Sequence, residues 1–320
     1  EVGTPKISSS THPEEDKWYN ASLVKLSWSV PQDLSKIRQF HYLFSKEKYV
    51  KMPMDLCSKT EKGDFETNAE EQGTYYFHIA AEDNAGNISE EPGVYAVNVD
   101  LKALPPSVIS MTHPNPAKYY SEKKPVFAAE KVDDLSGIDG FFYKIDGNPE
   151  TIPDKKSGVF THDSTINIKE SLDDGEYYFH IVLKDKAGNV GTEASHFKFR
   201  IETAAPDVSI KRFDRYQASE SFEVEWSGDD NESGIACFDV EYKEGEKGKW
   251  KSWLKETKLT KQVFKGEDGI TYYFRVRAKD NAGNWSDFYE DKDMYTTIDI
   301  SAPTQITQVT ARPAAGGVIE

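Results

Sequence analysis

One short peptide, present three times, constrains this chain more than any other feature. It occurs as Asp83-Asn84-Ala85-Gly86-Asn87, Asp185-Lys186-Ala187-Gly188-Asn189 and Asp280-Asn281-Ala282-Gly283-Asn284. Each copy follows an aromatic-rich segment, and successive copies lie about one hundred residues apart, which is the length of a domain. This period exceeds the roughly 20–50-residue unit of solenoids. Each copy is therefore expected to close its own core, giving three modules in tandem.

A second set of anchors fixes the phase of the repeat. Thr11-His12-Pro13 returns as Thr112-His113-Pro114, and each copy ends in a strand-like run followed by a short joint that contains proline. Short joints with proline favour a semi-rigid array. The chain begins with a segment that resembles such a joint, so we interpret it as a fragment or processed form. The predicted division is 1–102, 103–203 and 204–300 for the three modules, with 301–320 as a linker and the first strand of a truncated fourth module.

The hydrophobic pattern within a module has a period of two. Tyr75, Phe77 and Ile79 alternate with Tyr76 and His78, as in a half-buried strand. Corresponding runs recur in all three copies, and signals for helices are absent. Many short alternating strands separated by Gly, Asn, Asp and Pro predict an all-β chain of three antiparallel sandwiches. The repeated Asp-x-Ala-Gly-Asn peptide fits a turn that joins the last two strands of each sandwich.

Charge and composition exclude several classes of function. The net charge of −16 argues against nucleic acid, which requires a basic face, and against an anionic membrane surface. No run of eighteen apolar residues is present, so direct membrane insertion of this segment is not expected. The two cysteines, Cys57 and Cys237, fall in different modules, which excludes a disulfide scaffold.

Catalysis is not expected either. All seven histidines fall in the first two copies, and most of them recur at corresponding places, whereas a catalytic triad should be unique in the chain. His78 and His180 in particular are expected on the outward face of a strand. We therefore predict that the chain is not an enzyme and holds no organic cofactor.

The order of these residues resembles the fibronectin type III module. The resemblance rests on Trp28, on Tyr75-Tyr76-Phe77-His78-Ile79 and on the turn that follows, and it extends over about residues 1–300. The Tyr-Tyr-Phe strand followed by Asp-x-Ala-Gly-Asn is similar to bacterial and archaeal versions in exported proteins. The resemblance implies that Trp28 and Trp226 are core residues of the second strand, and that Tyr75, Tyr177 and Tyr272 open the sixth. Ala129 replaces the tryptophan in the second copy, where Phe127 or Phe142 would fill the space.

Calcium is the metal that the acidic loops would suit. In the type III topology two loops lie at the pole that faces the preceding joint, so carboxylates there would gather near the first joint, around Asp100, and near the second joint. Oxygen ligands in such a group suit calcium, which takes six to eight of them. The alternative is that these residues are solvated turn formers. The candidate ligands are Asp133, Asp134 and Asp185 at the first joint and Asp229, Asp230 and Asp280 at the second.

A glycan-binding platform is a further candidate, in the third module. Trp250, Trp253 and Trp285 could stack on sugar rings if they are exposed, although packing in the core is the alternative for each. Trp250 and Trp253 are three residues apart and would point to opposite faces of a strand.

The leading hypothesis for function is a structural spacer, stalk or surface-layer segment of a larger exported prokaryotic protein, located outside the cell or at its surface. Its partners would be neighbouring domains of the same protein. One alternative is an adhesive or carbohydrate-binding role toward a glycan or another surface protein. Another is that the modules are accessory parts of an exported hydrolase.

Overall fold

The computed structural model describes residues 2–49 and 51–303, and it confirms the all-β prediction. Three pairs of sheets follow one another along the chain, and each pair combines a three-stranded with a five-stranded sheet. Two compact units are present, one within Glu1–Ala117 and Glu122–Arg200 and the other within Lys118–Ser121 and Ile201–Glu320. The predicted opening strand of a fourth module lies, from residue 304 onward, outside the described residues.

In its described residues, 2–49 and 51–102, the first module contains eight strands and one 3-10 helix. Its elements are β1 (Ile7–Ser9), β2 (Trp18–Tyr19), β3 (Leu23–Trp28), β4 (Ile37–Ser45), η1 (Met54–Leu56), β5 (Ser58–Thr60), β6 (Asp64–Asn68), β7 (Gly73–Asp83) and β8 (Gly93–Val99). The sheets have the orders β1-β3-β6 and β2-β8-β7-β4-β5. Strand β2 pairs with β8 in parallel, whereas β8 and β4 pair with β7 in antiparallel fashion.

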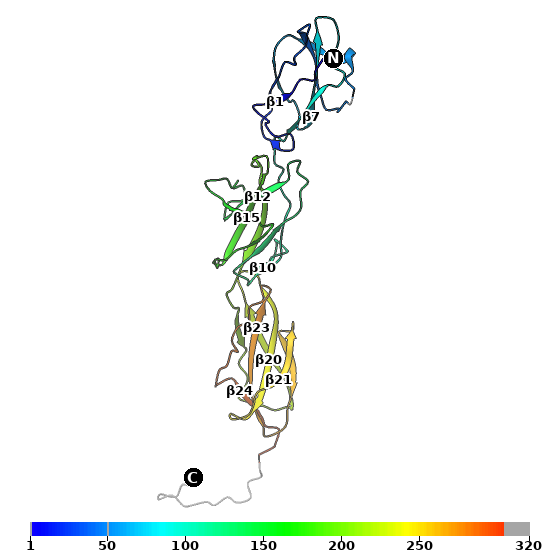
Figure 1. Cartoon of the computed structure of the whole chain (residues 1–320). Coiled ribbons are helices and arrows are strands. Elements are labelled where there is room, and N and C mark those ends of the chain that lie inside the picture. The colour runs from blue at the N-terminus through cyan, green and yellow to red at the C-terminus, as the bar shows by residue number, and fades with distance from the viewer. Residues whose placement is uncertain (1, 50, 304–320) are drawn as a thin grey trace, which may run out of the picture. The chain divides into compact units, whose positions relative to one another are not determined.

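The second module repeats this arrangement with strands β9 to β16 (Figure 1). They are β9 (Val108–Ser110), β10 (Tyr119–Tyr120), β11 (Val126–Ala129), β12 (Ile138–Asp146), β13 (Val159–Thr161), β14 (Thr165–Asn167), β15 (Gly175–Asp185) and β16 (Ser195–Ile201). The sheet orders are β14-β11-β9 and β10-β16-β15-β12-β13. The same strand order in both modules follows from the same hydrophobic pattern.

The third module contains strands β17 to β24. They are β17 (Asp207–Ile210), β18 (Tyr216–Gln217), β19 (Ser221–Asp229), β20 (Ile235–Glu244), β21 (Lys251–Thr257), β22 (Lys261–Lys265), β23 (Thr271–Asp280) and β24 (Tyr295–Ile298). The sheet orders are β17-β19-β22 and β18-β24-β23-β20-β21. In every module the fourth strand is irregular at its start, where it faces the end of the strand that carries the Asp-x-Ala-Gly-Asn turn.

Aromatic residues from both sheets form the cores. Trp28 and Trp226 are buried, as the resemblance implied, and Trp28 stacks on Phe77 with ring centroids 5.6 Å apart. In the second module Phe127 is completely buried and stacks on Phe179 at 4.0 Å. Phe127 thus fills the core beside Ala129, which is the outcome expected where the tryptophan is missing.

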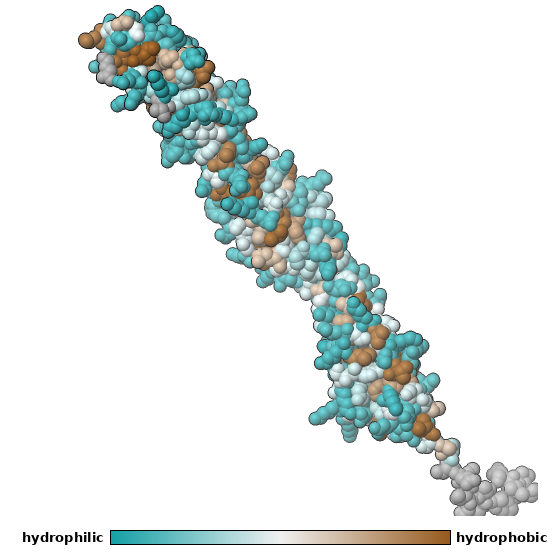
Figure 2. All heavy atoms as spheres, turned by 90° about the vertical axis from the view of Figure 1, so that its right-hand side faces the viewer, coloured by the Kyte–Doolittle hydropathy of each residue, from teal (hydrophilic) through white to brown (hydrophobic). Residues whose placement is uncertain are grey.

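The face seen in Figure 2 is largely hydrophilic, with apolar residues scattered in small groups. This pattern agrees with the acidic composition and is ordinary for a folded protein surface. Among the described residues, no helix has the length and apolar character needed to cross a bilayer.

Candidate metal centres and aromatic surfaces

The Asp-x-Ala-Gly-Asn peptide forms the predicted turn and orients a carboxylate. Asp185 Oδ1 accepts hydrogen bonds from the backbone N–H groups of Gly188 and Asn189, both at 2.7 Å, and its Oδ2 accepts one from Asn189 Nδ2 at 2.6 Å. Gly188 has a φ of +99°, which an L side chain rarely adopts. The turn that begins at Asp280 makes the same three bonds. Both carboxylates are thereby held in fixed orientations.

A second loop brings another carboxylate to each turn. Asp134 Oδ1 accepts bonds from the Gly137 backbone N–H at 3.0 Å and from the Ser136 hydroxyl at 3.1 Å. Asp230 Oδ1 accepts a bond from the Gly234 backbone N–H at 2.6 Å. These loops precede β12 and β20, whose irregular starts lie beside the two turns.

The third carboxylate comes from the segment that precedes the module. Asp100 follows β8, and Glu202 follows β16; both are buried, with 0% and 2% of their surface exposed. The Asn189 Nδ2 group donates to the Asp100 backbone carbonyl at 2.8 Å, and the Asn284 Nδ2 group donates to the Glu202 carbonyl at 3.0 Å. The turn therefore fixes the backbone from which the third carboxylate projects.

Two acidic clusters result. Within each, one carboxylate oxygen from each of the three residues lies no more than 4.8 Å from those of the other two. None of the ion pairs between described residues includes a member of either cluster. We refer to them as the Asp100 cluster (Asp100, Asp134 and Asp185) and the Glu202 cluster (Glu202, Asp230 and Asp280).

Burial and nearby negative charges raise the pKa of one carboxylate in each cluster. Burial raises the pKa of Asp134, and the negative charges of Asp100 and Asp185 raise it further. Burial likewise raises the pKa of Glu202, with added contributions from Asp230 and Asp280. Protonation or a bound cation would relieve the repulsion in either cluster.

Four of the six sequence-predicted ligands lie in these clusters, and two do not. Asp133 and Asp229 are exposed and lie outside the clusters. Glu202 was not among the predicted ligands. Its place directly after the last strand of a module, equivalent to that of Asp100, is the signal that could have identified it.

The first module has the same turn in a different setting. Asp83 accepts bonds from the backbone of Ala85 and Asn87 and from Asn87 Nδ2, each at 2.8 Å. The Asn87 side chain holds the pKa of Asp83 below its usual value. Among the described residues no group of three acidic side chains converges on this turn.

The three tryptophans of the predicted glycan platform have different surroundings. Trp253 packs on the core residues Trp226 and Phe264, with centroids 6.2 and 5.2 Å apart. Trp250 lies under Lys243 and Arg275, the latter 4.5 Å from the ring centroid. Trp253 is thus partly buried against the core of the sandwich, while cations cover part of the Trp250 ring.

The third tryptophan, Trp285, is partly exposed and carries the Arg277 guanidinium 4.4 Å from its ring centroid. Arg277 also contacts Phe288, on which Arg275 stacks at 4.1 Å. Trp250, Arg275, Phe288, Arg277 and Trp285 therefore form a ladder of alternating aromatic and cationic groups. A sugar could reach only the ring faces that the cations leave free.

The histidines are more buried than the sequence indicated. His78 and His180 point away from the core of their strands, yet neither is exposed at all. The Tyr49 backbone N–H donates to His78 Nε2 at 3.0 Å, so the chain that precedes η1 covers this histidine. Both side chains lie on the outward face of their strands, as predicted, but local contacts cover them there, so that this face is not open to solvent.

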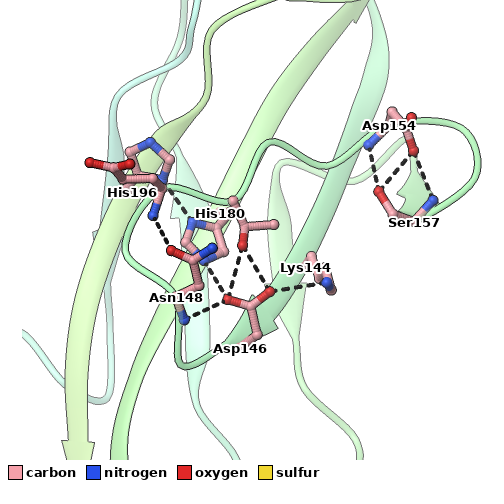
Figure 3. A network of polar contacts seen from close by, with 9 residues as sticks. Lys144, Asp146, Asn148, Asp154, Ser157, His180 and His196 are labelled. Atoms are coloured by element: carbon pink, nitrogen blue, oxygen red, sulfur yellow. Dashed lines mark hydrogen bonds and ion pairs between the residues drawn. The ribbon is translucent and has the colours of Figure 1, made fainter.

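His180 belongs to a polar network in the second module. Figure 3 shows it between Asp146 of β12 and His196 of β16, at 3.1 Å and 2.7 Å. Burial favours protonation of Asp146, but bonds from Lys144, the Asn148 backbone and other donors hold its pKa at about 2. The Ser157 hydroxyl is bonded to Asp154 instead of a histidine. The Thr151 hydroxyl of the network donates to Asp146. Neither hydroxyl is bonded to His180, whereas the serine of an Asp-His-Ser triad is bonded to its histidine.

These sheets and turns define a chain of fibronectin type III-like β-sandwich modules. No family model matches the sequence, and no curated protein matches it. Among solved structures, the FN1-FN3 domains of chicken CNTN1 align with 92% of this chain and 99% of their own, with 15% identity and a TM-score of 0.33. The fibronectin(III)-like modules of Clostridium thermocellum CbhA align with 61% and 94%, with 15% identity and a TM-score of 0.28.

Proposed function

We propose that this chain is a structural spacer within a larger exported prokaryotic protein, extracellular or at the cell surface, with no catalysis of its own. The observation that carries the proposal is the repeated bond between the turn of a module and the segment preceding it. Asn189 Nδ2 donates to the Asp100 carbonyl, and Asn284 Nδ2 donates to the Glu202 carbonyl. Each bond fastens the segment before a module to the turn of that module, and such an attachment is what a spacer requires.

Two further features support the proposal. The two groups of three converging acidic side chains in the described residues lie beside the joints, at the starts of the second and third modules. The acidic composition also suits a solvated segment that avoids self-association. The partners of such a spacer are the neighbouring domains of the same protein.

Small-angle X-ray scattering on the whole chain tests the proposal. Strands of seven to ten residues that rise about 3.3 Å each give modules of roughly 25–35 Å, so three modules in line should span on the order of 100 Å. A compact scattering profile would reject the spacer.

The double variant Asn189→Ala with Asn284→Ala should require a broader ensemble of conformations to fit its scattering. The matched control is Asn87→Ala, because the Asn87 side chain bonds Asp83 but no preceding carbonyl among the described residues. If the control broadens the ensemble equally, the broadening does not come from loss of the bonds at the joints.

Glycan binding by the third module is the second candidate, supported by the partial exposure of Trp250 and Trp285. A glycan array probed with the whole chain and with Trp285→Ala tests it. Binding that depends on Trp285 would favour adhesion, and a blank array would remove this candidate. An accessory role beside an exported hydrolase is compatible with either candidate.

A further inference from the structure

We propose that the Asp100 cluster and the Glu202 cluster each bind one calcium ion. The proposal goes beyond the spacer function and does not depend on it. It rests on two observations that are independent of the acidic composition: carboxylate oxygens that are buried without a partner, and the spacing of the converging oxygens.

The unpartnered oxygens belong to the most deeply buried member of each cluster. Asp100 is 0% exposed, and its Oδ1 has no hydrogen-bond partner among the described residues. Glu202 is 2% exposed, and neither carboxylate oxygen has such a partner. The hydroxyl and the backbone N–H of Ser233 both lie near enough to favour the charged form of Glu202. Neither makes a hydrogen bond of ordinary geometry with its carboxylate, and the hydroxyl donates to Asp230 at 3.5 Å. Asp100 Oδ2 does accept a hydrogen bond, from the Ser136 backbone N–H at 3.1 Å. Buried charges normally have partners, whereas Asp100 Oδ1 and both oxygens of Glu202 have none among the described residues.

The spacing of the oxygens fits a single ion. Calcium binds oxygen at about 2.3–2.6 Å, so two oxygens on opposite sides of one ion lie about 5 Å apart. The limit of 4.8 Å within each cluster satisfies this condition. A divalent ion between the three carboxylates would attract each of them and so outweigh their repulsion of one another.

The chemistry of the ligands selects the metal. All three side chains in each cluster offer oxygen, and neither cluster contains histidine or cysteine, which argues against zinc and copper. Magnesium requires a near-ideal octahedron and retains several waters, whereas calcium accepts irregular geometry. Each cluster takes its ligands from three separate segments, an arrangement that suits the more tolerant ion.

The turns also prepare the ligands before the ion arrives. The N–H groups of Gly188 and Asn189 fix the Asp185 carboxylate, and the equivalent groups fix Asp280. A preorganised ligand loses less conformational freedom on binding. Asp83 has the same turn but no cluster among the described residues, so the turn alone is not expected to bind calcium.

The test is the stoichiometry of calcium binding to the whole chain, measured by native mass spectrometry and by titration calorimetry. The parent chain should bind two ions. Asp134→Asn and Glu202→Gln should each weaken one site about 100-fold and leave one ion bound, because each variant replaces one of three charged ligands. The combined variant should bind none.

Matched controls change the same charge next to each cluster. Asp133→Asn and Asp229→Asn alter exposed neighbours and should retain two ions. In chelator, Asp134→Asn and Glu202→Gln should be at least as stable as the parent, because each relieves repulsion in an empty cluster. This comparison, made by thermal unfolding, separates loss of a ligand from loss of the fold.

Three results would overturn the proposal. One is the absence of binding at millimolar calcium. Another is that the Asp134→Asn and Glu202→Gln variants still bind two calcium ions each. The third is an equal loss in the Asp133→Asn and Asp229→Asn controls, which would indicate weak binding to surface charge. A chain that binds no calcium could still scatter as an extended spacer, so the two proposals fail separately.

Discussion

Replacement of Trp226 tests how the core of the third module is stabilised. Its side chain is 3% exposed and contacts Phe238 and Trp253, with ring centroids 6.5 and 6.2 Å away. The indole Nε1 has no hydrogen-bond partner among the described residues. Its stabilising effect is therefore expected to come from packing alone.

Trp226→Ala should lower the free energy of unfolding of the third module by about 3–5 kcal/mol, the usual cost of deleting a large buried aromatic side chain. Trp226→Phe should cost only about 1–2 kcal/mol, because a phenyl ring fills much of the cavity and no hydrogen bond is lost. The packing argument therefore predicts that the loss of unfolding free energy is clearly larger for Trp226→Ala than for Trp226→Phe.

Hydrogen–deuterium exchange with mass spectrometry measures both changes in the whole chain. Peptides from β19 and β23 should exchange faster by about tenfold for each 1.4 kcal/mol lost, and peptides from β3 and β7 in the first module serve as the internal control. A cost for Trp226→Phe as large as that for Trp226→Ala would refute the reasoning. It would mean that the indole nitrogen contributes through a bond that the structure lacks.

Three other predictions address the first two modules. Tyr75→Phe should lower the free energy of unfolding by about 1–2 kcal/mol, because the tyrosine is only 8% exposed and donates to the Glu71 carbonyl at 2.8 Å. Tyr177→Phe should lower it less, because the hydrogen bond of Tyr177 is longer and exposed. Denaturant unfolding of the two variants would measure both losses. Gly93→Ala should destabilise the first module by about 1–3 kcal/mol, since an added Cβ would lie 2.5 Å from the Pro5 carbonyl oxygen, and calorimetry of the whole chain should detect the loss. Acidification from pH 7 to 5.5 should destabilise the first two modules but not the third, which has no histidine. Hydrogen–deuterium exchange, corrected for the effect of pH on the intrinsic exchange rate, would show which modules are destabilised. The histidines responsible have a pKa lowered by burial and are His12, His78, His113 and His180.

The sign of that pH effect follows from proton uptake. A buried histidine with a lowered pKa stays neutral in the folded module and takes up a proton on unfolding once the pH is below about 6.5. Stability that is present above this pH is then lost as the pH falls, by up to about 1.4 kcal/mol per pH unit for each such histidine. Equal acid sensitivity of the third module would contradict this explanation.

Local sequence pattern was sufficient to predict the strands and the turns. Alternation along Val24, Leu26 and Trp28 placed the inward face of β3 correctly, since the burial of a strand follows its period of two. The Asp-x-Ala-Gly-Asn turn was also predictable, because its hydrogen bonds join residues within five positions of one another.

Features that depend on distant packing were not predictable from the same patterns. Asp133 and Asp134 are adjacent in an irregular loop, and the pattern did not indicate which of them faces the turn. The position of Glu202 after its strand could be read from the sequence, but its approach to carboxylates of two loops depends on the fold. The burial of His78 likewise depends on the segment around Tyr49, whose path over the sheet has no periodic signal.

The bond from Asn189 to the Asp100 carbonyl has a consequence for how such arrays lengthen. The donor belongs to the incoming module, while the acceptor is a backbone carbonyl, which every residue possesses. A tandem duplication of about one hundred codons therefore supplies its own attachment to whatever module precedes it. The number of modules can change during evolution without a new set of complementary side chains arising at each junction.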